Sequence, residues 1–313
     1  MKLTVASSPH IRGDFRTSRL MLDVVLALLP ALVAGIWVLG IRALYVTLAS
    51  VAAAVVSEWL FQLALRRRNT LPDCSALVTG LLLGMTLPAS CPIWVAAIGS
   101  VFAIVVAKLL CGGLGQNVFN PALAGRAFLL LVFPVALTRY ETVDGVSSAT
   151  PLHHMVMPAL PEESILDMFF GNCPGSIGEL SALALLLGGV YLVVRKVISA
   201  RIPLAYLGTV AVLTLVFHKT DDAISWMLYS LFSGGLMLGA IFMATDYATS
   251  PVTAKGQILY GIGCGVLTVV FRYFGLYPEG VSYAILLMNA CVWTIDRYTA
   301  PRRFGMKGGK ANA

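Results

Sequence analysis

Residues 20–40 read LMLDVVLALLPALVAGIWVLG, and residues 43–65 read ALYVTLASVAAAVVSEWLFQLAL. Each run is long enough for a helix to cross the hydrocarbon core of a bilayer, which takes about 20 apolar residues. The second run stops at three consecutive arginines, residues 66–68. Two adjacent runs of this length and polarity predict membrane-spanning helices.

The composition points to the same class over the whole chain. Of 313 residues, 58% are apolar and 12% are charged, whereas a soluble domain carries about 25% charged residues. Disordered chains are polar and rich in charge, so disorder is excluded. Six scattered cysteines in so long a chain also exclude a secreted disulfide scaffold. The sequence therefore predicts an all-α integral membrane protein surrounded by membrane lipid.

Ten apolar runs indicate about ten transmembrane helices. They cover residues 20–40, 43–65, 75–87, 92–111, 121–137, 179–194, 202–217, 224–244, 257–275 and 281–295. No cleavable signal peptide is visible before the first run, which is expected to remain as an anchor. The predicted organisation is a cytoplasmic segment 1–19, helices one to five over 20–137, a periplasmic loop 138–178, helices six to ten over 179–296, and a basic cytoplasmic tail 297–313.

The basic residues indicate the orientation, because lysine and arginine are enriched in cytoplasmic loops. With both the N- and C-termini in the cytoplasm, all of the 22 basic residues fall on the cytoplasmic side except Arg42, Arg139, Lys219 and Arg272. The net charge of +7 therefore reflects orientation. No nucleic-acid partner is expected, because the basic residues are divided among many short loops.

Two pairs of short motifs suggest an internal repeat. Gly80-Leu-Leu-Leu-Gly84 resembles Gly235-Leu-Met-Leu-Gly239, and Asn120-Pro-Ala at the start of the fifth run is echoed by Asn289-Ala290 in the tenth. The two members of each pair lie five spans apart. Because five is an odd number, the second five-helix half would be inverted relative to the first, as in many transporters. The alternative is that such glycine pairs are simply common in membrane helices.

The longest stretch between apolar runs contains the string DGVSSATPLHH at residues 144–154. By composition this is a loop rich in serine and glycine. Its first seven residues, however, resemble the flavinylation motif D-x-x-[ST]-[SGA]-A-T of the membrane flavoprotein subunits of Rnf complexes and Na⁺-translocating NADH:quinone oxidoreductases. The matching residues are Asp144, Ser147, Ser148, Ala149 and Thr150.

The resemblance extends over nearly the whole chain. It includes the opening Ser7-Ser-Pro-His10, the segment from Asn117 through Asn120-Pro-Ala to Arg126, and the segment Phe242-Met-Ala-Thr-Asp246-Tyr-Ala-Thr-Ser-Pro251. The long N-terminal extension of the quinone-reductase relatives is absent, which favours the D-subunit branch of Rnf complexes.

The resemblance implies a function and a cofactor. A flavin transferase would attach FMN to Thr150 through a phosphoester, on the periplasmic face of a bacterial inner membrane. Sibling Rnf subunits would be the partners, and electrons would pass between ferredoxin and NAD⁺ in step with Na⁺ or H⁺ movement. The chain would not itself act on NAD⁺ or ferredoxin. The alternative is a secondary transporter with inverted repeats and no redox role.

Four further residues are candidates for sites. Asn117 and Asn120 could bind a second, non-covalent riboflavin, because amides match the donors and acceptors of a flavin edge; alternatively, Asn120-Pro121 simply caps a helix. Glu58 and Asp246 could lie on an ion path, because charged groups within or beside a span are often functional. Glu58 could equally pair with an arginine of a neighbouring span. No metal site is expected, since His153-His154 has no third ligand at a suitable spacing.

Overall fold

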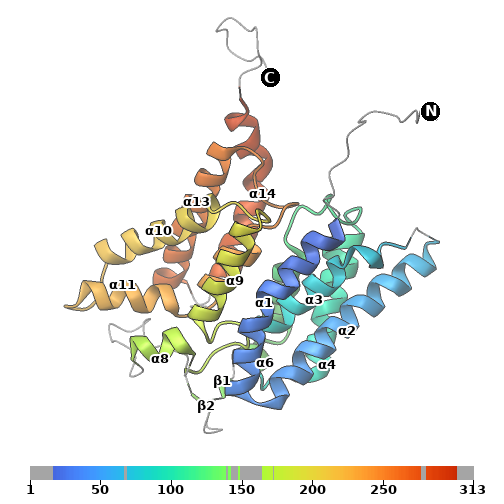
Figure 1. Ribbon diagram of the computed structural model, residues 1–313, viewed down its shortest axis with the longest axis horizontal. Helices are drawn as coiled ribbons and strands as arrows, with labels where there is room; N and C mark the ends of the chain where they lie inside the picture. Colours follow the sequence, from blue (N-terminus) through green and yellow to red (C-terminus); the bar gives the residue numbers. More distant parts are fainter. Residues whose placement is uncertain are drawn as a thin grey trace, which may run out of the picture.

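The computed structural model describes residues 17–66, 69–138, 140–141, 147–148, 164–171, 173–275 and 280–301. Helices make up most of these residues (Figure 1). The first half contains α1 (Thr17–Leu39), α2 (Ile41–Ala64), η1 (Leu71–Asp73), α3 (Ser75–Met85), α4 (Ile93–Phe102), η2 (Ala103–Leu109), α5 (Pro121–Val132) and α6 (Pro134–Thr138). The second half contains α8 (Ile165–Phe170), α9 (Ala182–Val194), α10 (Arg201–Val216), α11 (Ala223–Phe232), α12 (Leu236–Leu238), η3 (Gly239–Met243), α13 (Ala254–Phe274) and α14 (Val281–Thr299).

Each of the ten predicted spans is helical over most of its length, but their lengths differ from the prediction. Within the described residues, α1, α2 and α13 are long and apolar enough to cross a bilayer. A fourth candidate, α11 with α12–η3, is bent by 63°. Five other apolar helices have only 10–17 residues. The architecture is thus that of a multi-pass membrane protein with three or four full-length spans and several short helices packed between them.

The breaks have local causes. Pro134 divides the predicted fifth span into α5 and α6, because proline cannot donate the backbone hydrogen bond that would continue the helix. The predicted eighth span breaks at Gly234, whose φ of 63° lies in the left-handed region. Two stretches, η2 and η3, are π-helical, a variant often found at functional sites.

The contacts between helices follow one scheme in both halves. In the first half α2 packs on α3 and α4, and α4 packs on α5; in the second half α10 packs on α11 and α13, and α13 packs on α14. The α1–α9 and α5–α14 contacts join the halves. Close approach depends on glycine: a Cβ on Gly80 would lie 2.7 Å from the Cα of Val51, and one on Gly261 would lie 2.9 Å from the carbonyl oxygen of Ile202.

The motif echoes do not occupy equivalent positions. Gly80 and Gly84 face α2, whereas Gly239 faces α14. Asn120 caps the start of α5, whereas Asn289 lies in the middle of α14. The echoes in sequence therefore do not by themselves mark corresponding contacts.

The predicted periplasmic loop is described only in part. Two short strands, β1 (Tyr140–Glu141) and β2 (Ser147–Ser148), pair in antiparallel fashion, with Tyr140 opposite Ser148. Asp144, Ala149 and Thr150 lie outside the described residues. Residues 173–181 return to the bundle, where the Ile177 and Gly178 backbone N–H groups donate to carbonyls at the end of α3.

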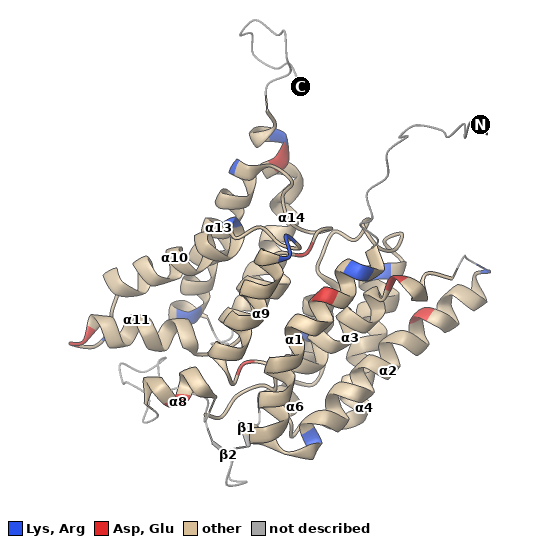
Figure 2. Cartoon of the chain, in the orientation of Figure 1, with Lys and Arg blue, Asp and Glu red and all other residues tan. Residues whose placement is uncertain are grey.

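The charges are distributed unevenly between the ends of the bundle. The first turn of α1 and the last turn of α14 lie at the same end, and most lysines and arginines gather toward it (Figures 1 and 2). Lys108 and Arg126, which the sequence assigned to cytoplasmic segments, are instead buried within helical segments, and Glu179 is buried as well. These three charges therefore do not report orientation.

Candidate functional site

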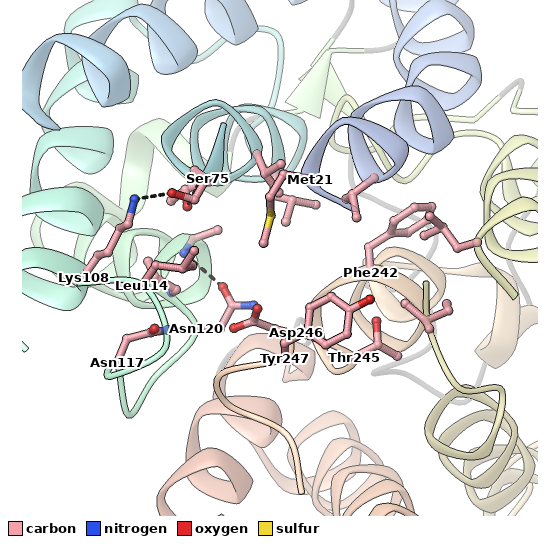
Figure 3. A pocket seen from close by; sticks show the side chains of 18 residues that line it. Met21, Ser75, Lys108, Leu114, Asn117, Asn120, Phe242, Thr245, Asp246 and Tyr247 are labelled. Atoms are coloured by element: carbon pink, nitrogen blue, oxygen red, sulfur yellow. Dashed lines mark hydrogen bonds between the residues drawn. The ribbon is translucent and has the colours of Figure 1, made fainter. Parts of the chain in front are cut away.

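A cavity opens between the two halves at the end of the bundle where α3 and α5 begin and α9 and η3 end. Its enclosed volume is about 70 Å³, below the roughly 300–1,000 Å³ typical of small-molecule sites, and the cavity is open at its mouth. We call it the first cavity (Figure 3). Its apolar wall includes Met21, Val24, Leu82, Leu192 and Phe242, and its polar groups include Lys108, Asn117, Asn120, Thr245, Asp246 and Tyr247.

The two predicted asparagines line this cavity and behave differently. Asn120 is a helix cap: its Oδ1 accepts from the Ala122 and Leu123 N–H groups at 3.0 and 3.3 Å, and its Nδ2 donates to the Met243 carbonyl at 3.1 Å. Asn117 donates from Nδ2 to the Phe119 carbonyl at 3.1 Å. Its Oδ1 is buried and has no hydrogen-bond partner among the described residues.

Asn289 joins this end of α5 to α14. With its amide oriented to satisfy both atoms, the oxygen accepts from the Asn120 backbone N–H and the nitrogen donates to the Thr249 carbonyl, each at 3.1 Å. The asparagine that echoes Asn120 in the sequence therefore supports it in space.

Lys108 contributes the cationic group of the cavity. It lies on η2, and its Nζ donates to Glu58 Oε2 at 2.7 Å and to Ser75 Oγ at 2.6 Å. Glu58 Oε1 also accepts from the Thr70 hydroxyl at 2.6 Å and from Gln62 Nε2 at 3.2 Å. Glu58 thus pairs across helices, as one of its alternatives proposed, with a lysine in place of an arginine.

Asp246 and Tyr247 approach from the other half, on the loop between η3 and α13. Burial raises the pKa of the Asp246 carboxyl, although hydrogen bonds from Thr249 and from backbone N–H groups oppose the shift. The Tyr247 hydroxyl donates to the Val197 carbonyl, which fixes the ring beside the cavity. A carboxyl group and an aromatic ring therefore face the lysine and amides of the first half (Figure 3).

The structure brings together three of the predicted site residues, Asn117, Asn120 and Asp246, although they come from two halves of the chain. Glu58 does not line the cavity and is reached only through Lys108. The sequence reasoning did not select Lys108 or Tyr247 as site residues. A signal for Lys108 was available, because a lysine inside an apolar run is functional by default.

The chemistry of the lining suits the polar edge of a planar ligand that enters through the mouth. The walls are apolar and aromatic, and the polar groups offer an ammonium, amides and a carboxyl. The unsatisfied Asn117 Oδ1 requires a donor, because a buried acceptor without a partner costs about 1–3 kcal/mol. An N–H group on a ligand edge would satisfy it.

Comparison with known proteins shows the family of the chain. The model of the NQR2, RnfD, RnfE family matches residues 4–305. The chain belongs to this family.

Three relatives cover between 92% and 100% of the chain. The D subunit of the Na(+)-translocating ferredoxin:NAD(+) oxidoreductase complex of Acetobacterium woodii is 48% identical, over 100% of this chain and 98% of that protein. The D subunit of the proton-translocating ferredoxin:NAD(+) oxidoreductase complex of Clostridium ljungdahlii is 44% identical, over 97% and 96%. The D subunit of the ion-translocating oxidoreductase complex of Stutzerimonas stutzeri is 40% identical, over 92% of each chain.

Proposed function

We propose that this chain is the D subunit of an ion-translocating ferredoxin:NAD⁺ oxidoreductase complex in a bacterial inner membrane, where it takes part in electron transfer coupled to ion movement. The observation that carries the proposal is the match at 48% identity to the Acetobacterium woodii protein, of which the chain covers 98%. Two relatives are named for different ions, Na⁺ and protons. Their names therefore do not assign a coupling ion to this chain.

We further propose that Thr150 carries FMN through a phosphoester, attached by a flavin transferase. The motif from Asp144 to Thr150 supports this, because the small side chains of Ser148 and Ala149 leave the threonine hydroxyl accessible to a transferase. The flavin supplies one- and two-electron chemistry, while the protein tunes it through hydrogen bonds and dielectric. A phosphoester tether leaves the ring unmodified and keeps it at the membrane surface.

The test is made on the purified complex from cells that contain the transferase. The wild-type chain should fluoresce as a flavoprotein on a denaturing gel, and its intact mass should include one FMN. Thr150→Ala should be dark, whereas the matched control Ser148→Ala should fluoresce, because the motif accepts alanine at that position. Fluorescence that survives Thr150→Ala would refute the attachment site.

The rival interpretation is a secondary transporter without a redox role. A colourless complex from a host with active transferase would favour it, since a transporter has no use for the flavinylation motif. A purely structural anchor is distinguished by a third result, namely normal turnover of the complex that carries Thr150→Ala.

For the first cavity we propose a second, non-covalent flavin such as riboflavin. Asn117 supports it, because its buried Oδ1 needs a donor and a flavin edge presents one. In a Thr150→Ala background, flavin released by denaturation should come only from this cavity. Asn117→Leu should abolish the released flavin, and the exposed Asn69→Leu should not. Equal flavin release from the two variants would refute the assignment.

Of the two candidates for an ion path, Asp246 is the one that we retain as an ion ligand. Asp246 lines the first cavity. Glu58 does not, and its carboxylate already accepts hydrogen bonds from Lys108, Thr70 and Gln62. Asp246→Asn should lower ion uptake into proteoliposomes more than it lowers electron transfer. The exposed Asp222→Asn at the other end of the bundle is the control, and an equal loss in both variants would refute the role.

We also propose that the ten helical segments form two inverted five-helix repeats with both termini in the cytoplasm. Support comes from the parallel contact schemes of the two halves, α2–α3–α4–α5 and α10–α11–α13–α14, and from the α1–α9 and α5–α14 contacts that join corresponding helices. The concentration of basic residues at one end supports the orientation (Figure 2).

A further inference from the structure

A second cavity lies beside the first, behind the Tyr247 ring. It is formed by the α9–α10 loop, the first turn of α10, the loop after η3 and the start of α13, and its volume is about 290 Å³. Its polar lining includes Lys196, Ser199, Ser250 and Gln257. Thr245 and Tyr247 line both cavities.

The charge of the second cavity is positive. Lys196 adopts a φ of 58°, a left-handed conformation that is uncommon for a residue other than glycine. Among the described residues Lys196 forms no ion pair, whereas its neighbour Arg195 pairs with Asp23 at 3.4 Å. The exposed Arg201 directly precedes Ile202, which also lines the cavity.

The start of α10 adds one backbone donor to this positive charge. Ser199 Oγ accepts from the Arg201 N–H at 3.4 Å, and Pro203 has no N–H, so the Ile202 N–H is the one left in the first turn of this 16-residue helix. A free N–H together with the helix dipole favours an anion. At the start of α13, by contrast, the Asp296 carboxylate accepts from the Val252 and Thr253 N–H groups at 3.1–3.4 Å.

The two helices that contribute to the second cavity carry exposed apolar side chains. On α9, Val190 and Val194 are 59% and 73% exposed, and on the first turn of α10, Leu204 is 69% exposed. An anion that carries long hydrocarbon chains would place its charge in the cavity and its chains along these residues. Basic pockets at the ends of membrane helices are suited to phospholipid headgroups.

We propose that the second cavity binds the phosphate of an anionic phospholipid, with the Lys196 and Arg201 side chains and the Ile202 N–H of α10 as donors and the acyl chains on α9 and α10. The bound headgroup would fix the loop whose Val197 carbonyl holds the Tyr247 hydroxyl. A lipid would thereby stabilise the wall that the two cavities share. This inference does not depend on the proposed redox function.

The test uses the intact complex in nanodiscs of phosphatidylcholine with or without phosphatidylglycerol. After detergent extraction, native mass spectrometry should detect phosphatidylglycerol retained on the wild-type chain. Lys196→Asn removes the charge and tolerates the left-handed backbone, and Arg201→Gln removes the second charge. Each should weaken retention about five-fold, the effect expected of one basic residue at a lipid surface. Arg66→Gln is the matched control, because Arg66 is also exposed and has a positive φ of 49°.

Three results would overturn the proposal. If Lys196→Asn and Arg201→Gln retain as much phosphatidylglycerol as wild type, the second cavity is not the lipid site. If Arg66→Gln loses as much lipid as these two variants, the binding reflects general surface charge. Displacement of the lipid by inorganic phosphate at equal concentration would assign the cavity to free phosphate. An unchanged elution profile of each variant complex confirms that it is folded.

Discussion

Lys108→Met is the substitution for which the structure gives the largest expected effect on stability. The ammonium lies 2.7 Å from Glu58 Oε2, and the two side chains are 2% and 0% exposed. At an effective dielectric constant of about 20, this separation corresponds to roughly 6 kcal/mol of attraction. The desolvation of both groups offsets much of it. Removal of one partner, however, leaves a buried charge without its counter-ion, which costs about 3–5 kcal/mol.

The double variant Glu58→Gln/Lys108→Met should recover most of that loss. Glutamine keeps an acceptor for the Thr70 hydroxyl, and Ser75 keeps its hydrogen bond to Asp73. No buried charge then remains at the pair. The double variant should lie within about 1–2 kcal/mol of wild type, because replacing both members of a buried pair is often nearly neutral.

The assay is thermal unfolding of the detergent-solubilised complex, with the midpoint followed by loss of the intact complex on size exclusion. The control Lys255→Met alters an exposed lysine and should shift stability by less than about 0.5 kcal/mol. Two outcomes refute the reasoning. One is a Lys108→Met midpoint equal to that of the control. The other is a double variant whose loss of stability equals the sum of the losses in Lys108→Met and Glu58→Gln.

Two further predictions concern packing and orientation. Gly80→Ala should destabilise the bundle by about 1–3 kcal/mol, because its Cβ would meet Val51, whereas Gly208→Ala meets no atom within 4 Å and should be neutral or stabilising in the same thermal assay. Exposed Cys111 should react with an impermeant maleimide only from the cytoplasmic side; buried Cys91, whose pKa burial raises to about 11, should stay unmodified at about pH 7.5. Labelling of Cys111 from the periplasm would reverse the proposed topology.

The helices can be predicted from the sequence because their signal is local. A run of about 20 apolar residues has few structures open to it in a bilayer, so each predicted span is largely helical. The break at Pro134 also has a local signal. The 63° bend after Phe232 has a local signal in Gly234, but the donor for its carbonyls has none: Arg272 of α13 donates to the Ser230 and Ser233 carbonyls at 2.5 and 2.9 Å.

Part of the candidate site can also be predicted from the sequence, and part of it cannot. The motif at Asp144–Thr150 and the cap at Asn120 are contiguous in sequence and can be recognised there. The first cavity cannot be recognised in the sequence, because Asn117 and Asp246 come together only through the packing of the two halves. Lys108 shows the limit most clearly: in the sequence its charge supports the predicted orientation, whereas its partner Glu58 lies 50 residues away and on another helix.

The buried arginines explain how the bundle tolerates short helices. A helix that ends inside the protein leaves carbonyl groups that water cannot reach, and such groups need donors. Arg126 from α5 donates to the carbonyl of Thr86, the C-cap of α3, at 2.5 Å, and Arg272 from α13 donates to that of Ser233, the C-cap of α11. The positive charge also matches the negative end of each helix dipole. One arginine in each half therefore stabilises a helix end that would otherwise carry unsatisfied groups, and the α3 end supported by Arg126 is also the end to which residues 177 and 178 bond.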